Sequence, residues 1–432
     1  MSRGRLAFSL AILFGLNFMN FYDRQVVGAI GERLKNEWQL TDGQLGGLTT
    51  AFILLYAIAG IPLGRLADRG RRPVILGVGA LVWSGFTALC GLTTGFASLF
   101  ACRIGVGIGE ASCAPAANSL IGDLFPKEQR ARAISVFMLG LPLGIGASYA
   151  VSGAIMQATG GWRGALLVAA IPGIILGLLA FLLPEPVRGS ADGAVHRERP
   201  RDPGAIGAIL RIPTMWWIIV SGAFINLNLY AMGAFLTSFL IRYHGLDIGD
   251  ANYVSAGINL LGGSAGMLGG GWLGDWAAKR RTDGRLRAAA MALFLAVPLG
   301  ILALGQGRGL YWNFALLLMP VFALHTVYYS TVYASIQDVV EPARRGTAMA
   351  VYFLAFYFAT AIGLYAFGKW SDHLAARAVA AGASAVDGRA LGLHGALYVI
   401  PVVAGLVALA LWAGSRTLSR DHARMRERLG AA

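Results

Sequence analysis

The chain has 432 residues, of which 56% are hydrophobic and 13% are charged, and it carries a net charge of +14. An ordinary soluble domain has about 25% charged residues, and a soluble chain this apolar would expose large adhesive patches. A soluble globular fold is therefore excluded, and apolar runs of about 20 residues along the whole chain indicate a membrane protein.

Twelve apolar runs separated by polar breaks predict twelve transmembrane helices. The runs cover residues 6–31, 44–66, 74–95, 97–121, 132–157, 163–183, 213–241, 250–276, 288–305, 311–336, 346–368 and 394–414. We interpret the first as a helix rather than a cleaved signal peptide, because it is too long and carries Asp23 and Arg24. The cysteines, Cys90, Cys102 and Cys113, lie inside runs and are expected to be packing residues.

A polar segment between the sixth and seventh runs is rich in Pro and Arg and predicts a linker. We expect an N-terminal six-helix half (residues 1–183), a cytoplasmic linker (184–212), a C-terminal six-helix half (213–414) and a basic cytoplasmic tail (415–432).

The positions of the basic residues predict the orientation in the membrane. With the N-terminus placed in the cytoplasm, 26 of the 36 Lys and Arg residues fall in cytoplasmic segments and 8 in outer segments. The other two, Arg24 and Arg103, lie inside spans. Because cytoplasmic loops carry an excess of Lys and Arg, both termini are expected in the cytoplasm. The same asymmetry explains the basic charge without a nucleic-acid partner.

Two loops occur in both halves, in the same order. The first reads G-x-L-x-D followed by basic residues, with Gly64, Asp68, Arg69, Arg71 and Arg72 in one copy and Asp275, Lys279 and Arg280 in the other. The second places an arginine seven residues after an aspartate, namely Arg130 after Asp123 and Arg345 after Asp338. Duplicated six-helix halves are typical of secondary transporters, whose substrate site lies near the midplane between the halves.

Four charged residues lie deep inside predicted spans, and such residues usually face a cavity and serve function. They are Asp23 and Arg24 in the first span and Arg103 and Glu110 in the fourth. At 1.5 Å per residue, Asp23 and Arg103 lie about 12 Å and about 9 Å below the outer ends of their helices, at a similar depth. Glu110 comes almost two turns after Arg103 and falls on the same helix face.

These four residues suit proton-coupled transport. A buried carboxylate can take up a proton, whereas an arginine stays charged. We expect Asp23 and Glu110 to carry protons, and Arg24 and Arg103 to be their charge partners or contacts for an anionic substrate group. The alternative is a structural salt-bridge cluster whose protonation never changes.

The second half has almost no buried charge, but it has many polar and aromatic side chains within its spans. The candidate lining of a substrate cavity consists of Asn226, Asn228, Tyr230, Asn259, His325, Tyr329, Tyr333 and Tyr357. A neutral aromatic wall opposite a charged one suits an amphipathic substrate with a polar head and an apolar tail. The alternative is that the tyrosines pack, each with one satisfied hydroxyl.

With these motifs the chain resembles the major facilitator superfamily over its full length, since Gly64, Leu66, Asp68, Arg69 and Arg71-Arg72 match its signature loop in a copy one residue short. The stretches Asn20-Phe21-Tyr22-Asp23-Arg24 and Gly105-Val-Gly107-Ile-Gly109-Glu110-Ala111 resemble the spinster branch, including its bacterial members. The resemblance implies an all-α integral membrane fold with twelve transmembrane helices in two pseudo-symmetric six-helix halves. It also implies alternating access, with Asp68 meeting the start of the eleventh helix near Gly346 and Thr347.

The resemblance and the residues together favour a transporter over an enzyme. No metal-ligand spacing, dinucleotide loop or Walker sequence is present, so we expect no metal, no cofactor and no ATP. We expect a monomer in the inner membrane, driven by protons, that moves an amphipathic or lipid-like substrate of the lysolipid or sphingoid type, as the spinster resemblance implies. The alternatives are a transporter of a small soluble organic solute or drug, and a non-transporting membrane receptor.

Overall fold

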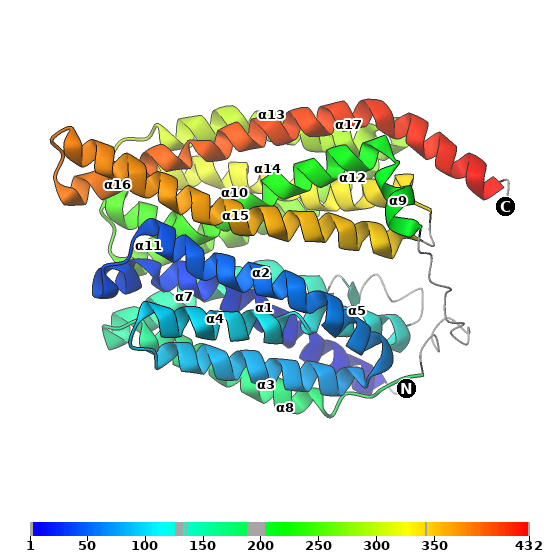
Figure 1. The fold of residues 1–432 in the computed structure, drawn as a ribbon, viewed down its shortest axis with the longest axis horizontal. Coiled ribbons are helices and arrows are strands. Elements are labelled where there is room, and N and C mark those ends of the chain that lie inside the picture. Colours follow the sequence, from blue (N-terminus) through cyan, green and yellow to red (C-terminus); the bar gives the residue numbers. More distant parts are fainter. Residues whose placement is uncertain (1–2, 126–132, 135, 188–203, 342–343, 431–432) are drawn as a thin grey trace. The chain divides into compact units, whose positions relative to one another are not determined.

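Helices form all the regular secondary structure of the described residues, which are all except 1–2, 126–132, 135, 188–203, 342–343 and 431–432 of this computed structural model (Figure 1). The chain divides into two compact units. The first comprises residues 1–199 and 247–256, and the second comprises residues 200–246 and 257–432.

The first unit consists of the helices α1 (Arg3–Trp38), α2 (Asp42–Arg69), α3 (Arg72–Gly91), α4 (Phe96–Glu110), α5 (Cys113–Leu124), α7 (Gly140–Thr159), α8 (Arg163–Ala180) and most of α11 (Ile248–Gly257). Within it, α3 packs along α8 and α1 packs along α7. Gly144 permits the close approach of α7 to α1, because a Cβ atom there would stand 2.2 Å from the carbonyl oxygen of Phe18. Asn252 attaches α11 to this unit, since its Nδ2 donates to the carbonyl oxygen of Ala29 at 3.1 Å.

The second unit consists of α9 (Ala205–Leu210), α10 (Pro213–His244), the π-helical turn η2 (Ile258–Gly262), α12 (Gly263–Arg280), α13 (Gly284–Leu304), α14 (Tyr311–Val339), α15 (Arg345–Ala380), α16 (Ala385–Leu397) and α17 (Val399–Gly430). Here α13 packs against α14 and α17, and α10 packs against α15 and α17. Gly266 lets α12 approach α14, because a Cβ atom there would lie 1.9 Å from the carbonyl oxygen of Ala323.

Apolar side chains also cover outward faces of the helices. On α8 they form a stripe at helical spacing, and each is more than a third exposed: Leu167, Ile171, Ile175 and Leu178. Such a stripe is favourable in contact with lipid tails and unfavourable in contact with water. Among the described residues, eleven helical stretches are long and apolar enough to cross a bilayer. The chain is therefore a multi-pass integral membrane protein.

The predicted eighth span, residues 250–276, is the one apolar run that is not among these eleven stretches. It is helical, but η2 divides it into α11 and α12, and α12 is rich in glycine. Each of the three pieces is too short or too weakly apolar to qualify alone. The predicted span is nevertheless helical throughout, from Ile248 to Arg280, and only its π-helical turn was not predicted from the apolar run.

The predicted fourth span, residues 97–121, is also interrupted. Pro115 has no N–H to donate to the carbonyl of Ala111, and the helix breaks at Ala111 and Ser112 before it resumes as α5. The hydroxyl of Ser112 donates to the Gly109 carbonyl oxygen at 2.8 Å, so a carbonyl at the break is satisfied. The break falls immediately after Glu110.

Helices also extend beyond the predicted boundaries. The predicted linker contains the short helix α9, and the predicted tail continues α17 as far as Gly430. The helix α1 runs to Trp38, seven residues past the predicted end of the first span, where Lys35 Nζ pairs with Asp42 Oδ1 at 2.5 Å. Residues 188–203 of the predicted linker lie outside the described residues.

Candidate functional site

Two of the four buried charges form an ion pair in the first unit. Arg24 Nε on α1 donates to Glu110 Oε2 on α4 at 3.0 Å, and neither side chain is more than 5% exposed. Asn20, one turn earlier on α1, contacts both: its Oδ1 accepts from Arg24 Nη2 at 2.8 Å, and its Nδ2 donates to the main-chain oxygen of Glu110 at 3.4 Å. The other carboxylate oxygen, Glu110 Oε1, has no hydrogen-bond partner among the described residues.

Arg103 contacts the main chain of Asp23 rather than its carboxylate group. Arg103 Nη1 donates to the main-chain oxygen of Asp23 at 3.2 Å, and both residues are fully buried. Within the described part of the chain, neither carboxylate oxygen of Asp23 has a hydrogen-bond partner, and neither do Nε and Nη2 of Arg103. A buried ionised carboxylate without a partner is costly, so Asp23 is a group at which a proton or a polar ligand would be stabilised.

Aromatic rings surround the two guanidinium groups. Arg24 Cζ lies 4.3 Å from the ring centroid of Tyr56 and 4.8 Å from that of Phe21, and Arg103 Cζ lies 4.9 Å from that of Phe52. A desolvated cation over an aromatic face gains about 2 kcal/mol. The rings therefore stabilise both arginines as cations inside the helix bundle.

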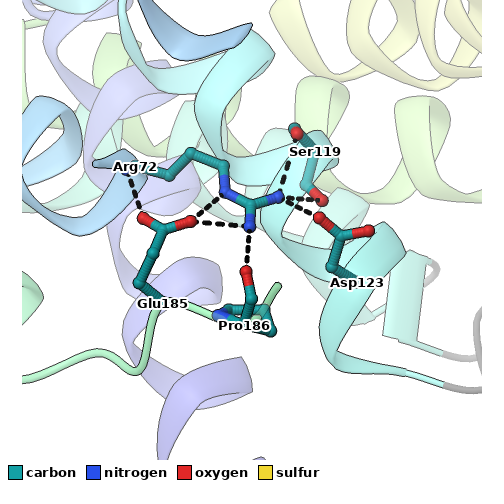
Figure 2. A network of polar contacts seen from close by, with 5 residues as sticks. All are labelled: Arg72, Ser119, Asp123, Glu185 and Pro186. Carbon is teal, nitrogen blue, oxygen red and sulfur yellow. Dashed lines mark hydrogen bonds and ion pairs between the residues drawn. The ribbon is translucent and has the colours of Figure 1, made fainter. Parts of the chain in front are cut away.

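Arg72, the last arginine of the signature loop, holds a second buried polar network (Figure 2). Its backbone N–H and its Nε donate to the two carboxylate oxygens of Glu185, each at 2.6 Å. Nη1 donates to the Ser119 main-chain oxygen at 3.0 Å and pairs with Asp123, and Nη2 donates to the Pro186 main-chain oxygen at 3.0 Å. The network joins the start of α3, the end of α5 and the segment after α8.

A matching arginine occurs in the second unit. Arg285 at the start of α13 donates through Nη1 to Asp338 Oδ2 at 2.7 Å and through Nη2 to Asp275 Oδ1 at 3.2 Å. Asp338 lies one residue before the end of α14, as Asp123 does in α5, so the loops that repeat in the sequence also repeat as contacts between an arginine and an aspartate.

The other predicted gating residues are exposed or half-buried, or lie wholly or with their side chains outside the described structure. Gly64 lies on α2, Arg71 precedes α3 with an exposed side chain, and Lys279 and Arg280 are exposed at the end of α12. Arg280 stacks on Trp276, with Cζ 4.0 Å from the ring centroid. The side chains of Asp68, Arg69 and Arg345, and the whole of Arg130, are outside the described residues.

Three of the predicted cavity tyrosines belong to one aromatic cluster in the second unit. The ring of Tyr329 contacts Tyr333, with centroids 5.9 Å apart, and Phe356, which in turn contacts Tyr357 at 5.1 Å. The hydroxyl of Tyr329 is buried and has no hydrogen-bond partner in the described part of the chain. The cluster thus combines apolar ring faces with one unsatisfied polar group.

His325 is held as a neutral ring. Its Nδ1 lies 2.9 Å from the Val321 carbonyl oxygen, which can only accept, so Nδ1 carries a proton. Asn228 Nδ2 donates to the Ile400 carbonyl oxygen at 3.0 Å and lies 3.3 Å from His325 Nε2, which must therefore accept. Both ring nitrogens are occupied, and the ring carries no positive charge in this arrangement.

The remaining predicted cavity residues are buried in the same unit. Asn226 Nδ2 donates to Thr360 Oγ1 at 2.9 Å, and Asn226 Oδ1 has no hydrogen-bond partner among the described residues. Asn259 lies in η2 and Tyr230 on α10. Among the described residues of the whole predicted cavity lining, Asn226 and Tyr329 each have a buried side-chain atom without a hydrogen-bond partner.

Several residues of these networks were not predicted from the sequence. Asn20 lies inside a span but carries no charge, and Glu185 is charged but follows a span. Neither is therefore a charged residue inside a predicted span. Arg285 could have been predicted from the sequence repeat. It lies at the start of α13 as Arg72 lies at the start of α3, and each pairs with an aspartate at a repeated position.

Comparisons with known proteins agree with this architecture. Residues 13–364 match the Major Facilitator Superfamily. A protein of Mycolicibacterium smegmatis named MFS-type efflux pump is 28% identical over 96% of this chain and 93% of its own length. The sphingosine-1-phosphate transporter SPNS2 of Danio rerio is 31% identical over 52% of this chain and 46% of its own length.

The solved structures agree as well. The crystal structure of a bacterial homologue of the human lysosomal transporter Spinster, in an inward-facing and unoccupied conformation, matches with a TM-score of 0.85 and 25% identity. The match covers 98% of this chain and 99% of that structure. The predicted family resemblance and all-helical membrane fold are confirmed, and the chain is a transporter rather than an enzyme. It belongs to the major facilitator superfamily and is of the spinster type.

Proposed function

We propose that this protein is a proton-coupled secondary transporter that moves an amphipathic or lipid-like substrate, of the lysolipid or sphingoid type, by alternating access. One observation carries the proposal: Asp23 and Glu110 lie fully buried beside two arginines, and three of their four carboxylate oxygens have no hydrogen-bond partner among the described residues.

The cluster is suited to coupling because its charges are incompletely paired. Arg24 is held by Glu110 and Asn20, while the hydrogen bond that Arg103 makes among the described residues is to the main-chain oxygen of Asp23. A proton on Asp23 or Glu110 changes which carboxylate an arginine pairs with. An anionic substrate group that binds Arg24 or Arg103 would displace a carboxylate and favour its protonation. Substrate and proton binding then bias the same conformational equilibrium, which is the requirement for coupling.

The substrate class is supported by chemistry on both units. Arginine recognises phosphate and carboxylate groups through its planar fork. In the second unit the predicted cavity lining has aromatic faces, and among its described residues Tyr329 Oη and Asn226 Oδ1 are buried without a hydrogen-bond partner. A relative named as a sphingosine-1-phosphate transporter matches about half of the chain. A small soluble solute or drug is the second candidate, because a relative that spans nearly the whole chain is named as an efflux pump.

The setting follows from the same reasoning. We place both termini and the linker in the cytoplasm, because 26 of 36 basic residues then lie on the cytoplasmic side. The proposal also includes a monomer in the inner membrane. Protease cleavage of a C-terminal tag in right-side-out vesicles would contradict this orientation, and protection of the tag would support it.

Transport by the purified protein in proteoliposomes tests the proposal. With sphingosine-1-phosphate and lysophosphatidylcholine as probes, an imposed pH gradient should drive accumulation by the wild type. Asp23→Asn and Glu110→Gln should each abolish gradient-driven accumulation, while the exposed control Glu427→Gln should leave it intact. Accumulation at wild-type level in both buried variants would refute proton coupling. Transport of soluble solutes with neither lipid probe accepted would refute the substrate class.

A further inference from the structure

A surface pocket of the second unit includes none of the buried charged residues Asp23, Arg24, Arg103 and Glu110. Its walls come from the end of α9, the end of α14 with the residues after it, and the terminal part of α17. The lining residues are Ala208, Ile209, Arg211, Ile212, Val339, Val340, Glu341, Arg344, Asp421, Arg424 and Met425. Three arginines and two carboxylates therefore line one pocket on an otherwise apolar base.

Both carboxylates of the pocket already have partners. Asp421 Oδ2 accepts from the backbone N–H of Thr214 at 3.0 Å and from its hydroxyl at 2.7 Å, so it caps the start of α10. Glu341 Oε2 pairs with Arg344 Nη1 at 3.2 Å. Among the described residues, no carboxylate lies within ion-pair distance of Arg211 or Arg424. The pocket thus presents two exposed guanidinium groups without an ion-pair partner among the described residues, and its five charged lining side chains carry a net charge of +1.

The surroundings place these charges beside apolar surface. Trp216 Nε1 donates to the main-chain oxygen of Leu210 at 2.8 Å, which fixes α9 against the start of α10. Ile206 on α9 is 54% exposed and Trp216 is 51% exposed, next to the end of the apolar span Pro213–His244. Tryptophan at the end of a span marks the level of lipid headgroups. Basic pockets between helix ends at this level bind phosphate headgroups.

We propose that this pocket binds a phosphate-bearing anion through Arg211 and Arg424. The planar forks of the two side chains match phosphate oxygens, and the exposed apolar residues beside them match the acyl chains of a phospholipid. A membrane phospholipid and a soluble phosphate ester share this headgroup chemistry. Because the pocket joins α9, α14 and α17, its occupant stabilises the packing of the chain after the linker against the C-terminal helix.

Lipid retention by the full-length protein tests the site. Protein from nanodiscs that contain equal amounts of phosphatidylglycerol and phosphatidylcholine is examined by native mass spectrometry. Thermal unfolding is followed separately with added inorganic phosphate or glycerol phosphate. We expect the wild type to retain phosphatidylglycerol preferentially, or to be stabilised by the soluble phosphates if the occupant is a soluble ester. The double variant Arg211→Gln/Arg424→Gln should weaken that binding at least about tenfold.

The matched control is Arg420→Gln, an exposed arginine one turn earlier on α17 that does not line the pocket. It should bind phosphate-bearing ligands as the wild type does. The proposal is overturned if Arg420→Gln loses as much binding as the double variant, since the effect would then reflect total charge. It is also overturned if the wild type neither prefers phosphatidylglycerol nor responds to soluble phosphate.

Discussion

Replacing Arg72 by Gln tests the buried network of the first unit. The Arg72 side chain is fully buried, whereas its partners Asp123 and Glu185 are 14% and 24% exposed. Removing one member of a buried ion pair costs about 3–5 kcal/mol, and partial hydration of the two carboxylates favours the lower end of that range. We therefore expect Arg72→Gln to lower the free energy of unfolding by about 3 kcal/mol.

The assay is thermal unfolding of the purified protein in detergent, with Arg71→Gln as the matched control. Arg71 is adjacent, exposed and makes no side-chain cap to α3, so its replacement should change stability by less than about 0.5 kcal/mol. The Arg72 variant should unfold several degrees below both the wild type and the control. Equal unfolding temperatures for the two variants would refute the view that this network stabilises the unit.

Three further outcomes are expected, two from the structure and one, at Asp68, from the family resemblance. Gly266→Ala should destabilise the second unit by about 1–3 kcal/mol because a Cβ atom there has no space. Gly269→Ala should not, since no atom lies within 4 Å of a Cβ atom at that position. Equal unfolding temperatures for the two variants would contradict the close approach of α12 to α14. His325→Gln should leave the pH profile of transport unchanged, because the ring is neutral, and a shifted profile would show that it titrates. Asp68→Asn should favour inward opening, and unchanged cytoplasmic cysteine labelling would count against that role.

The fold could be predicted from the sequence because lipid imposes a simple rule. Apolar runs of spanning length, and basic residues concentrated on one side, depend on composition rather than on detailed packing. That rule could not predict the local irregularities of the fourth and eighth spans. Pro115 marked the break after Glu110, but a short break within an apolar run leaves mean hydropathy unchanged. The π-helical turn in the eighth run depends on local packing that periodicity does not report.

The candidate site could be predicted only at the level of which residues are buried and charged. Helix geometry placed Asp23 and Arg103 at a similar depth, but it could not specify that Arg103 contacts a main-chain oxygen while Arg24 takes the carboxylate of Glu110. Such choices depend on side-chain rotamers and on differences of about an ångström. Asn20 illustrates the same limit, because a neutral amide gives no signal of its own among apolar residues.

In the proposed mechanism, Asp23 and Glu110 change protonation inside the membrane. The most direct measurement is infrared difference spectroscopy of the reconstituted protein as the pH is changed, following the carbonyl stretch of protonated carboxylic acids. We expect the wild type to show bands that respond to pH. Asp23→Asn and Glu110→Gln should each lose one of these bands, and Glu427→Gln should retain all of them. Identical difference spectra for the wild type and both buried variants would contradict it, because the cluster would then keep one protonation state.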